Sequence, residues 1–358
     1  MTRPTFAHIN LDALRHNFNL VRHYAPDQQV MVMLKADAYG HGALQAAAAL
    51  SAVDAIAVAF IDEALALRRA GINKPISLLQ GVFDQQEIEL ACEHQLDLVI
   101  LHAEQAQMLE SANCSRPLRI WLKFDSGMHR LGFSADEYVL WFERLRQHPN
   151  VAEVRLMTHF SCADDPENPV TAQQEALFDQ LTSKLDATRS LANSAAIMGW
   201  PSTLRDCVRP GIMLYGVCPF ADWREDHRDL QAVMTLKTVI IATRELKAGE
   251  AVGYGGSWVA PKNCRIGIAS IGYADGYPRC LPFGTPVLVN GQRVPLVGRV
   301  TMDMITVDLS GREEVQVGDE VTLWGDGLPV EEIAEQAGTI AYELLTGVSK
   351  RVQRVYSE

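Results

Sequence analysis

Strand-like and helix-like segments alternate through the first two thirds of this 358-residue chain. Eight short apolar runs have the composition of buried strands, at residues 30–34, 55–58, 76–79, 98–101, 118–124, 154–159, 190–194 and 208–215. Helical patterns lie between most of them, at residues 62–70, 84–93, 103–110, 135–146 and 171–187. Eight β/α repeats favour a closed parallel barrel. An open doubly wound sheet is the alternative, although no G-x-G-x-x-G turn follows the first strand.

The pattern changes near residue 230, where short strands follow one another and Gly, Pro and Asn-Gly signals separate them. Only one clear helix follows, at 330–336. We therefore predict an N-terminal (β/α)8 TIM-like barrel over residues 1–229, a polar connection at 222–229, and a C-terminal mostly-β domain over residues 230–358. This division allows the first few residues of the chain to pair with the second domain. The strands expected in the second domain lie at 234–243, 265–271, 286–289, 294–297, 305–308 and 320–324.

Charge and cysteine content exclude several classes of protein. The net charge of −12 argues against a nucleic-acid or anionic membrane partner. No apolar run approaches the roughly twenty residues that cross a bilayer, and the first residues lack the apolar segment of a signal peptide. The seven cysteines are irregularly spaced and form no C-x-x-C pair, so we expect reduced thiols and no metal site. These features are typical of a soluble, cytoplasmic protein.

The first barrel strand ends in a lysine. Lys35 directly follows the apolar run 30–34, so its side chain can leave the core at the strand's carboxyl end. A desolvated lysine loses its proton easily, and a neutral amine attacks carbonyl groups, which makes Lys35 a candidate Schiff-base residue. Barrel sites lie at the carboxyl ends of the strands. Other candidate site residues at or after the carboxyl ends of predicted strands are Lys123, Arg130, His159, Ser194, Arg209 and Gly211.

Six stretches, taken in order, resemble the alanine racemases. They are VMLKADAYGHG at 32–42, LKFDSGMHRLG at 122–132, THFS at 158–161, VRPGIMLYG at 208–216, VGYG at 252–255 and GRVTMD at 298–303. The resemblance covers essentially the whole chain and implies the same barrel with a C-terminal β domain. It also implies an isomerase that interconverts L-alanine and D-alanine by two-base α-proton transfer with pyridoxal 5'-phosphate, for D-alanine supply to peptidoglycan or for alanine catabolism.

The resemblance assigns the cofactor site. Lys35 would carry pyridoxal 5'-phosphate as an internal aldimine. The phosphate ligands would be Tyr39, Ser194, the backbone amides of Gly211 and Ile212, and Tyr342. Arg209 would lie beside the pyridine nitrogen, where other enzymes of this cofactor place an acid. A guanidinium accepts no proton, and its charge opposes protonation of the pyridine nitrogen. We therefore expect the pyridine to stay neutral and to stabilise the carbanion only partly, which favours simple removal and return of the α-proton.

The resemblance also assigns two proton carriers, one for each face of the substrate. Lys35 would act on the D-enantiomer and Tyr254 on the L-enantiomer. An unperturbed phenol is a weak base near neutral pH, so the pKa of Tyr254 has to be lowered by nearby positive charge, supplied through His159 and Arg209.

Two residues of the β domain imply, by the resemblance, a homodimer with shared sites. In this family Tyr254 and Met302 reach the lysine site of the other subunit, and Tyr273 with Tyr342 narrows the substrate entrance. Arg130 would contact the substrate carboxylate or the phenolic oxygen of the cofactor. Lys123 beside it is often carbamylated in relatives, and the alternative is an ordinary ion pair with Asp125.

Other functions remain as alternatives. An amino-acid decarboxylase of the same architecture would place an acid where this chain has Arg209. A non-catalytic pyridoxal-phosphate carrier would need only the barrel, and no second base such as Tyr254. A racemase of broader specificity, acting on serine or larger amino acids, differs least from the leading interpretation.

Overall fold

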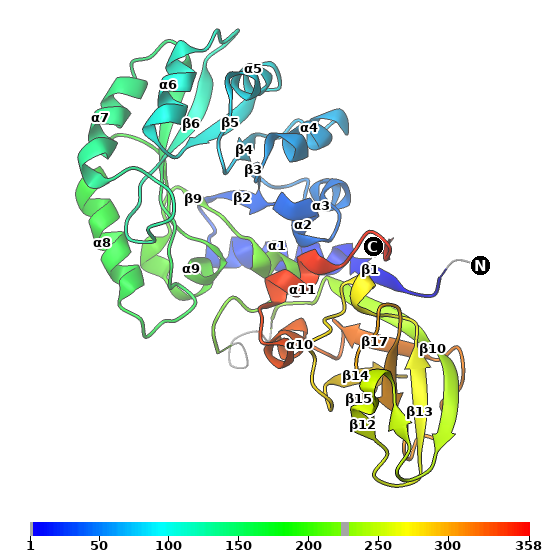
Figure 1. Cartoon of the computed structure of the whole chain (residues 1–358). Coiled ribbons are helices and arrows are strands. Elements are labelled where there is room, and N and C mark those ends of the chain that lie inside the picture. The colour runs from blue at the N-terminus through cyan, green and yellow to red at the C-terminus, as the bar shows by residue number, and fades with distance from the viewer. Residues whose placement is uncertain (1–2, 223–228) are drawn as a thin grey trace.

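The alternating segments form one parallel sheet. The computed structural model describes residues 3–222 and 229–358, and in it eight strands pair in the order β8-β7-β6-β5-β4-β3-β2-β9. The two ends of this order meet, because the Arg209 amide donates to the Ala192 carbonyl at 3.0 Å. The sheet therefore curls into a near-closed barrel (Figure 1), and the predicted TIM-like architecture is confirmed. Its strands are β2 (Gln29–Met33), β3 (Ala55–Val58), β4 (Ile76–Leu78), β5 (Leu96–Ile100), β6 (Leu118–Lys123), β7 (Val151–Met157), β8 (Arg189–Ser190) and β9 (Cys207–Val208).

Burial on both faces explains why these strands read as apolar runs. Every residue of β4 and β5 is buried, as expected for a parallel sheet that is covered by helices. The last two strands are much shorter than predicted. Asn193 ends the first of them by capping a helix, with Oδ1 accepting from the Ala196 amide at 3.0 Å. Pro210 follows the second and has no amide to donate to a neighbouring strand.

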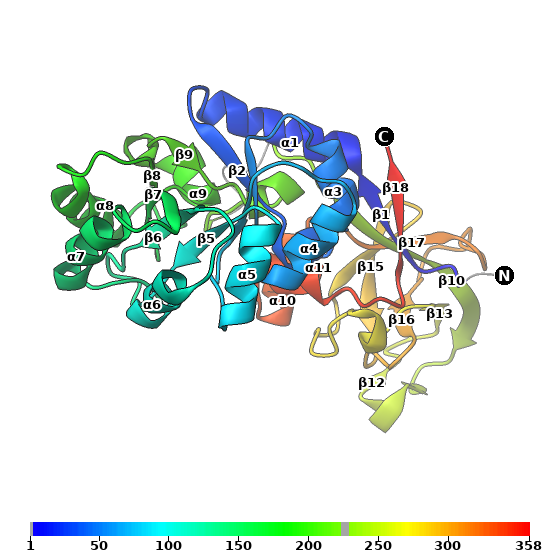
Figure 2. The same ribbon diagram turned by 90° about the horizontal axis from the view of Figure 1, so that it is seen from above.

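Helices surround the barrel (Figure 2). In α7 the buried residues are Tyr138, Trp141, Phe142 and Leu145, which is the spacing of one helical face. The helices that follow the barrel strands are α3 (Ala43–Ala49), α4 (Ile61–Arg69), α5 (Gln85–Glu93), α6 (Ala103–Ser111), α7 (Ala135–Leu145), α8 (Val170–Thr182) and α9 (Ser194–Gly199). The remaining ones in this half are α1 (Leu11–Tyr24), the short α2 (Lys35–Tyr39), and the 3-10 turns η1 (Pro201–Thr203) and η2 (Ile212–Tyr215).

The C-terminal part is a second, mostly antiparallel sheet, as predicted. Its strand order is β13-β16-β15-β14-β17-β10-β1-β18, and β13 also pairs with β10. The N-terminal β1 lies in this sheet, antiparallel to β10 and parallel to β18, and Figure 2 shows β1 and β18 side by side. The strands are β1 (Phe6–Asn10), β10 (Met234–Leu246), β13 (Cys264–Ala269), β14 (Pro286–Val289), β15 (Gln292–Val297), β16 (Ile305–Asp308), β17 (Glu320–Trp324) and β18 (Gln353–Ser357). A separate hairpin joins β11 (Ala251–Val252) to β12 (Trp258–Val259), and the 3-10 turns are η3 (Tyr254–Gly256) and η4 (Tyr273–Asp275).

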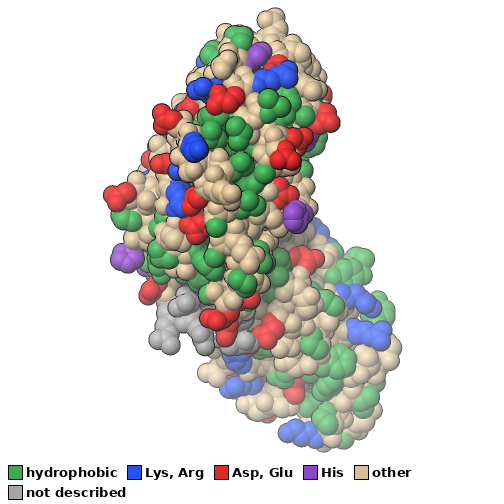
Figure 3. Space-filling model, turned by 90° about the vertical axis from the view of Figure 1, so that its left-hand side faces the viewer, with side chains coloured by type: hydrophobic (Ala, Val, Ile, Leu, Met, Phe, Trp, Pro, Cys, Tyr) green, Lys and Arg blue, Asp and Glu red, His purple; other side chains and the backbone are tan. Residues whose placement is uncertain are grey.

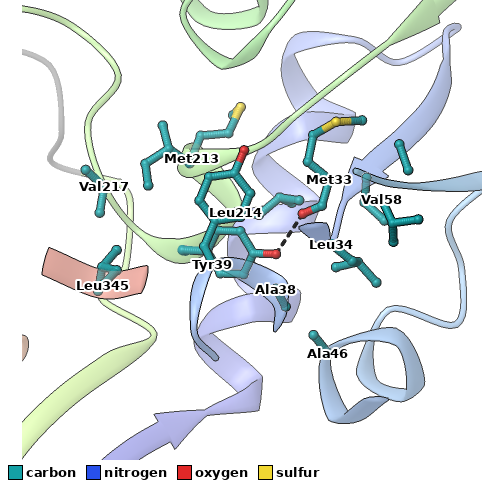
Figure 4. Packing of buried hydrophobic residues seen from close by; sticks show 14 of the residues in the cluster. Met33, Leu34, Ala38, Tyr39, Ala46, Val58, Met213, Leu214, Val217 and Leu345 are labelled. Atoms are coloured by element: carbon teal, nitrogen blue, oxygen red, sulfur yellow. Dashed lines mark hydrogen bonds between the residues drawn. The ribbon is translucent and has the colours of Figure 1, made fainter. Parts of the chain in front are cut away.

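Two helices, not one, follow the last predicted strand of this sheet. They are α10 (Val330–Ala337) and α11 (Ala341–Gly347), and Gly338 between them adopts φ +69°, which ends α10. The second helix packs against the lysine motif of the barrel. A Cβ on Gly40 would lie 2.3 Å from the Leu345 carbonyl oxygen, so only glycine allows this approach. The C-terminal part thus covers one side of the Lys35 segment (Figures 1 and 4).

The predicted connection at 222–229 lies largely outside the described residues. Within the described ranges no helix is both long and apolar enough to cross a membrane. On the face drawn in Figure 3, acidic and basic side chains are interspersed over the described residues.

Candidate active site

A left-handed turn follows the first barrel strand and sets the direction of Lys35. The Leu34 amide still pairs with the neighbouring strand, donating to the Ala57 carbonyl at 2.9 Å. The four residues after Lys35 (36–39) all have φ between +52° and +54°. Because none is glycine, this conformation costs roughly 1–2 kcal/mol per residue. Such strain persists only where surrounding contacts fix it, and it is often found at functional sites.

Acidic side chains hold this turn. Glu63 accepts from the Ala36 amide at 2.6 Å through Oε1 and from the Ala59 amide at 2.8 Å through Oε2. Asp37 accepts from the Ala43 amide at 2.8 Å and so ties the turn to the start of α3. Glu63 is not among the site residues predicted from the sequence. The available signal was an acid in the first turn of the helix that follows the second barrel strand, a position where a carboxylate can bind free amides.

The turn opens into a cavity of about 770 Å³ at the carboxyl ends of the barrel strands. Ten of the predicted site residues line it: Lys35, Tyr39, Lys123, Arg130, His159, Ser194, Arg209, Gly211, Ile212 and Tyr342. Nine come from the barrel, and Tyr342 comes from α11. Further lining residues that the sequence analysis did not name include Met128, Met157, Phe160 and Asp164. The three apolar residues among them carry no signal that separates them from core residues.

Three predicted residues do not line this cavity. Tyr254 on η3 is 75% exposed, Tyr273 on η4 is 41% exposed, and Met302 is 51% exposed. Tyr273 and Met302 lie on adjoining loops, because the Tyr273 amide donates to the Thr301 carbonyl at 3.0 Å and the Ala274 amide to the Met302 carbonyl at 3.1 Å. In this single chain they belong to the surface of the β domain.

The cavity is rich in positive charge. Burial lowers the pKa of Lys35, the charges of Arg130 and Arg209 lower it further, and Glu63 opposes the shift. Burial, with Arg209 and Arg130, lowers the pKa of Lys123 to about 8, against a smaller raising effect of Asp125. No hydrogen bond or ion pair within the described part of the chain holds the Lys123 ammonium. Both lysines therefore give up a proton more readily than a surface lysine.

Arg209 is buried and fixed by neutral groups. It donates to Ser190 Oγ and to the Thr158 carbonyl, both at 2.6 Å, and to the Leu191 carbonyl at 3.1 Å. Among the described residues no carboxylate forms an ion pair with it. Burial lowers the pKa of Arg209 to about 10, so the guanidinium remains charged at neutral pH. Its positive charge therefore faces the cavity uncompensated.

His159 is held in one neutral tautomer by Arg209. The distance from Arg209 Nη2 to His159 Nδ1 is 3.3 Å. A guanidinium can only donate, so Nδ1 accepts and the ring hydrogen lies on Nε2. Burial and the charges of Arg209, Lys123, Arg130 and Lys35 lower the pKa of His159 well below its usual value. The ring can therefore donate from Nε2 without carrying a charge.

Hydroxyls and free amides gather at one end of the cavity. Ser194 Oγ accepts from the Gly211 amide at 2.8 Å. The Ile212 amide, at the start of η2, finds no acceptor among the described residues. A Cβ on Gly211 would lie 2.8 Å from Tyr39 Oη, so glycine leaves this corner open. Burial raises the pKa of Tyr39, and raises that of Tyr342 to about 12, so both phenols keep their hydrogens. This set of donors fits an oxyanion with several acceptor oxygens.

No group of three or more metal-binding side chains occurs among residues 3–222 and 229–358. The lining includes the cations Lys35, Lys123, Arg130 and Arg209 and the hydrogen-bond donors around Gly211, which suit an anionic organic ligand.

Comparisons with known proteins agree with this arrangement over the whole chain. A family model described as "Alanine racemase, N-terminal domain" matches residues 9–219, and one described as "Alanine racemase, C-terminal domain" matches residues 233–356. The alanine racemase of Aeromonas hydrophila is 50% identical over 355 residues, which are 99% of this chain and 99% of that protein. This chain belongs to the alanine racemase family. The family resemblance and the enzyme class predicted from the sequence are therefore confirmed.

Solved members of the alanine racemase family have the same fold. The biosynthetic alanine racemase from Pseudomonas aeruginosa is 48% identical, with a TM-score of 0.97 and coverage of 100% of both chains. The alanine racemase from Acinetobacter baumannii is 40% identical, with a TM-score of 0.94 and coverage of 99% of this chain and 100% of that chain.

Proposed function

We propose that this chain interconverts L-alanine and D-alanine, with pyridoxal 5'-phosphate bound to Lys35. The observation that carries the proposal is the shared cavity, in which a buried lysine of lowered pKa faces a set of anion-binding donors and a buried arginine. Membership of the alanine racemase family supports the same reaction.

The residues present fit the cofactor. Lys35 would bind its aldehyde carbon, and Tyr39, Ser194, the Gly211 and Ile212 amides and Tyr342 would bind its phosphate. The Ile212 amide without an acceptor and the open corner at Gly211 support this assignment. When bound, pyridoxal phosphate withdraws electrons from the α-carbon of the amino acid, so that the α-proton can be removed. Burial and neighbouring charges lower the pKa of Lys35, and its amine would take or return that proton on one face.

Arg209 distinguishes this site from that of a decarboxylase of similar architecture. Its nitrogens donate to Ser190, Thr158 and Leu191, and it has no acceptor atom to share a proton with a pyridine nitrogen. A fixed positive charge at that position would oppose protonation of the pyridine nitrogen. A neutral pyridine withdraws electrons less strongly than a protonated one. We infer that it favours return of the proton over bond cleavage elsewhere on the α-carbon.

The second base would be Tyr254 of a second copy of the chain. Tyr254 is exposed and lies outside the cavity of its own chain. His159, with its hydrogen on Nε2, could donate to the phenolic oxygen of that tyrosine and stabilise a negative charge there. The active form would then be a homodimer with two shared sites. Met302 and Tyr273 from the second chain, together with Tyr342, would narrow the entrance and favour a small side chain.

Arg130 would bind the anionic end of the substrate, and Lys123 would hold Arg130 in position. Arg130 is a natural partner for a carboxylate. Lys123 has a pKa of about 8, so part of it is a neutral amine near neutral pH. A neutral amine adds carbon dioxide to form a carbamate, and this anion would hold Arg130 in position.

The test is an assay of separate L-amino acids with the purified chain and added pyridoxal phosphate, followed by chiral chromatography. L-Alanine should give a one-to-one mixture of enantiomers, because the two are mirror images of equal free energy. A faster conversion of serine than of alanine would indicate the broader racemase. No D-enantiomer from any amino acid would contradict the proposal.

A further inference from the structure

His41 is a buried histidine that the proposed reaction does not use. Its side chain is 1% exposed, and Nδ1 lies 3.0 Å from the Ala38 carbonyl oxygen and 2.9 Å from the Tyr39 carbonyl oxygen. Both partners can only accept, so the ring hydrogen lies on Nδ1 and is shared between them. Burial lowers the pKa of His41 to about 4, in agreement with a neutral ring. His41 therefore bonds the last two carbonyls of the left-handed turn.

The His41 ring also supports Tyr39 through a stack. It lies 4.5 Å from the ring of Tyr215 at an angle of 28°, and Tyr215 lies 4.9 Å from the ring of Tyr39 at 30°. Tyr215 Oη donates to the Met33 carbonyl at 2.8 Å, the bond marked by the dashed line on Met33 in Figure 4. The stack thus connects the end of β2 to the aromatic ring that follows Lys35.

Filling space is not a sufficient reason for a histidine at this position. Its Nε2 is buried and has no hydrogen-bond partner among the described residues. A leucine would fill similar space without leaving a polar atom unsatisfied. The histidine is explained by its other nitrogen, because Nδ1 lies within hydrogen-bond distance of both carbonyls of the turn.

We propose that His41 is a positioning residue for the phosphate of the cofactor. Its Nδ1–H fixes the Ala38 and Tyr39 carbonyls, so the left-handed turn holds Tyr39 Oη beside Gly211, where the phosphate would bind. This inference rests on the proposed function, and it predicts that loss of the δ donor weakens binding of the phosphate more than binding of the rest of the cofactor.

Asparagine and glutamine at position 41 form a matched pair. Both remove the ring and its stacking. Asparagine keeps a nitrogen donor on the δ position, whereas the glutamine amide lies one bond further out. We expect His41→Gln to raise the dissociation constant of pyridoxal phosphate about tenfold, and His41→Asn to raise it by no more than about threefold. The dissociation constants are measured by absorbance titration of each protein after removal of its cofactor.

Pyridoxal without the phosphate separates positioning from general damage. If His41 acts through Tyr39 and the phosphate, His41→Gln should leave the dissociation constant of pyridoxal nearly unchanged. Equal losses for both ligands, or equal losses in the two variants, would overturn the inference. A wild-type chain that binds neither ligand would instead refute the proposed function.

One measurement on the wild-type holoenzyme does not depend on the folding of a variant. Nitrogen NMR shifts of a histidine-labelled sample distinguish the two neutral tautomers of a buried ring. The inference requires the hydrogen on Nδ1 of His41. A hydrogen on Nε2 would exclude the two bonds to the turn.

Discussion

At the scale of single residues, the cavity is distinguished by four cations, none of which forms an ion pair with a carboxylate among the described residues. Lys35, Lys123, Arg130 and Arg209 all line it, and each lysine has a lowered pKa because of burial and the neighbouring charges. This arrangement lowers the stability of the folded chain while it has no anion bound. In the proposed function the same charges would bind a phosphate and a carboxylate, and they make Lys35 give up its proton more readily than a surface lysine.

Lys123 makes this cost measurable. Its pKa falls from 10.5 to about 8 on folding, so between these values the unfolded chain binds a proton that the folded chain does not. The free energy of unfolding should therefore rise with pH across that window, and the full penalty of the buried charge is present below about pH 8. We expect Lys123→Met to be more stable than the wild type at pH 7, with the advantage disappearing as the pH approaches 10.5.

Denaturant unfolding without cofactor and in carbon-dioxide-free buffer checks this expectation. Lys237→Met is the control, because Lys237 pairs with Glu320 at 2.8 Å on the surface. Its stability profile should run parallel to that of the wild type. If the Lys123→Met profile were also parallel, the lowered pKa would not contribute to stability.

At the scale of elements, one strained turn directs Lys35 and Tyr39 into the cavity. A right-handed helix after β2 would be the default for residues such as Ala36 and Ala38. Instead the chain turns the other way and brings both Lys35 and Tyr39 into the cavity, while α11 covers Gly40 from outside. Glu63, Asp37 and His41 supply the contacts that hold this conformation.

The strain predicts opposite effects of glycine in two neighbouring elements. Ala36 and Ala48 are both exposed, but Ala36 has φ +52° whereas Ala48 lies in the right-handed α3. Ala36→Gly relieves the steric cost of the left-handed conformation, but glycine loses more conformational entropy on folding. The free energy of unfolding should therefore rise by between zero and about 1 kcal/mol. Ala48→Gly should destabilise by about 1 kcal/mol. Urea unfolding of both variants compares them directly, and a larger loss for Ala36→Gly would mean that the turn is not strained.

At the scale of the whole molecule, the residues of the proposed catalytic set lie on two separate surfaces of the chain. The barrel cavity contains Lys35 but not Tyr254, which projects from the β domain of the same chain. A second copy is the simplest source of the missing base, because in a symmetric dimer each chain completes the site of the other.

Subunit mixing tests this division. Lys35→Ala and Tyr254→Phe homodimers should each be nearly inactive in conversion of L-alanine. Mixed dimers would contain one intact site, so random exchange should restore about a quarter of the wild-type activity. Mixing Lys35→Ala with itself under the same conditions controls for the exchange procedure. If no activity returns although exchange is demonstrated by mass, Lys35 and Tyr254 of different chains do not form one site.

Much of the fold could be predicted because it depends on local patterns. The alternation of apolar runs and amphipathic segments predicts the barrel, because the strand and the helix of each β/α unit can be recognised from the pattern of their own residues. The position of Lys35 directly after a buried strand also predicts its lowered pKa. The cofactor ligands, in contrast, came from a family resemblance, because an isolated Tyr39 or Tyr342 carries no local signal.

What only the tertiary structure decided depends on contacts between distant segments. The left-handed turn at 36–39 is intrinsically unfavourable and exists because Glu63 and His41 bond its backbone. Tyr342 reaches the barrel cavity because α11, which was not predicted, packs on Gly40. The β strands by themselves determine that a lysine lies at the rim of the barrel. The folded chain determines which way this lysine points and which groups lower its pKa, because burial and charge are properties of all the elements around it.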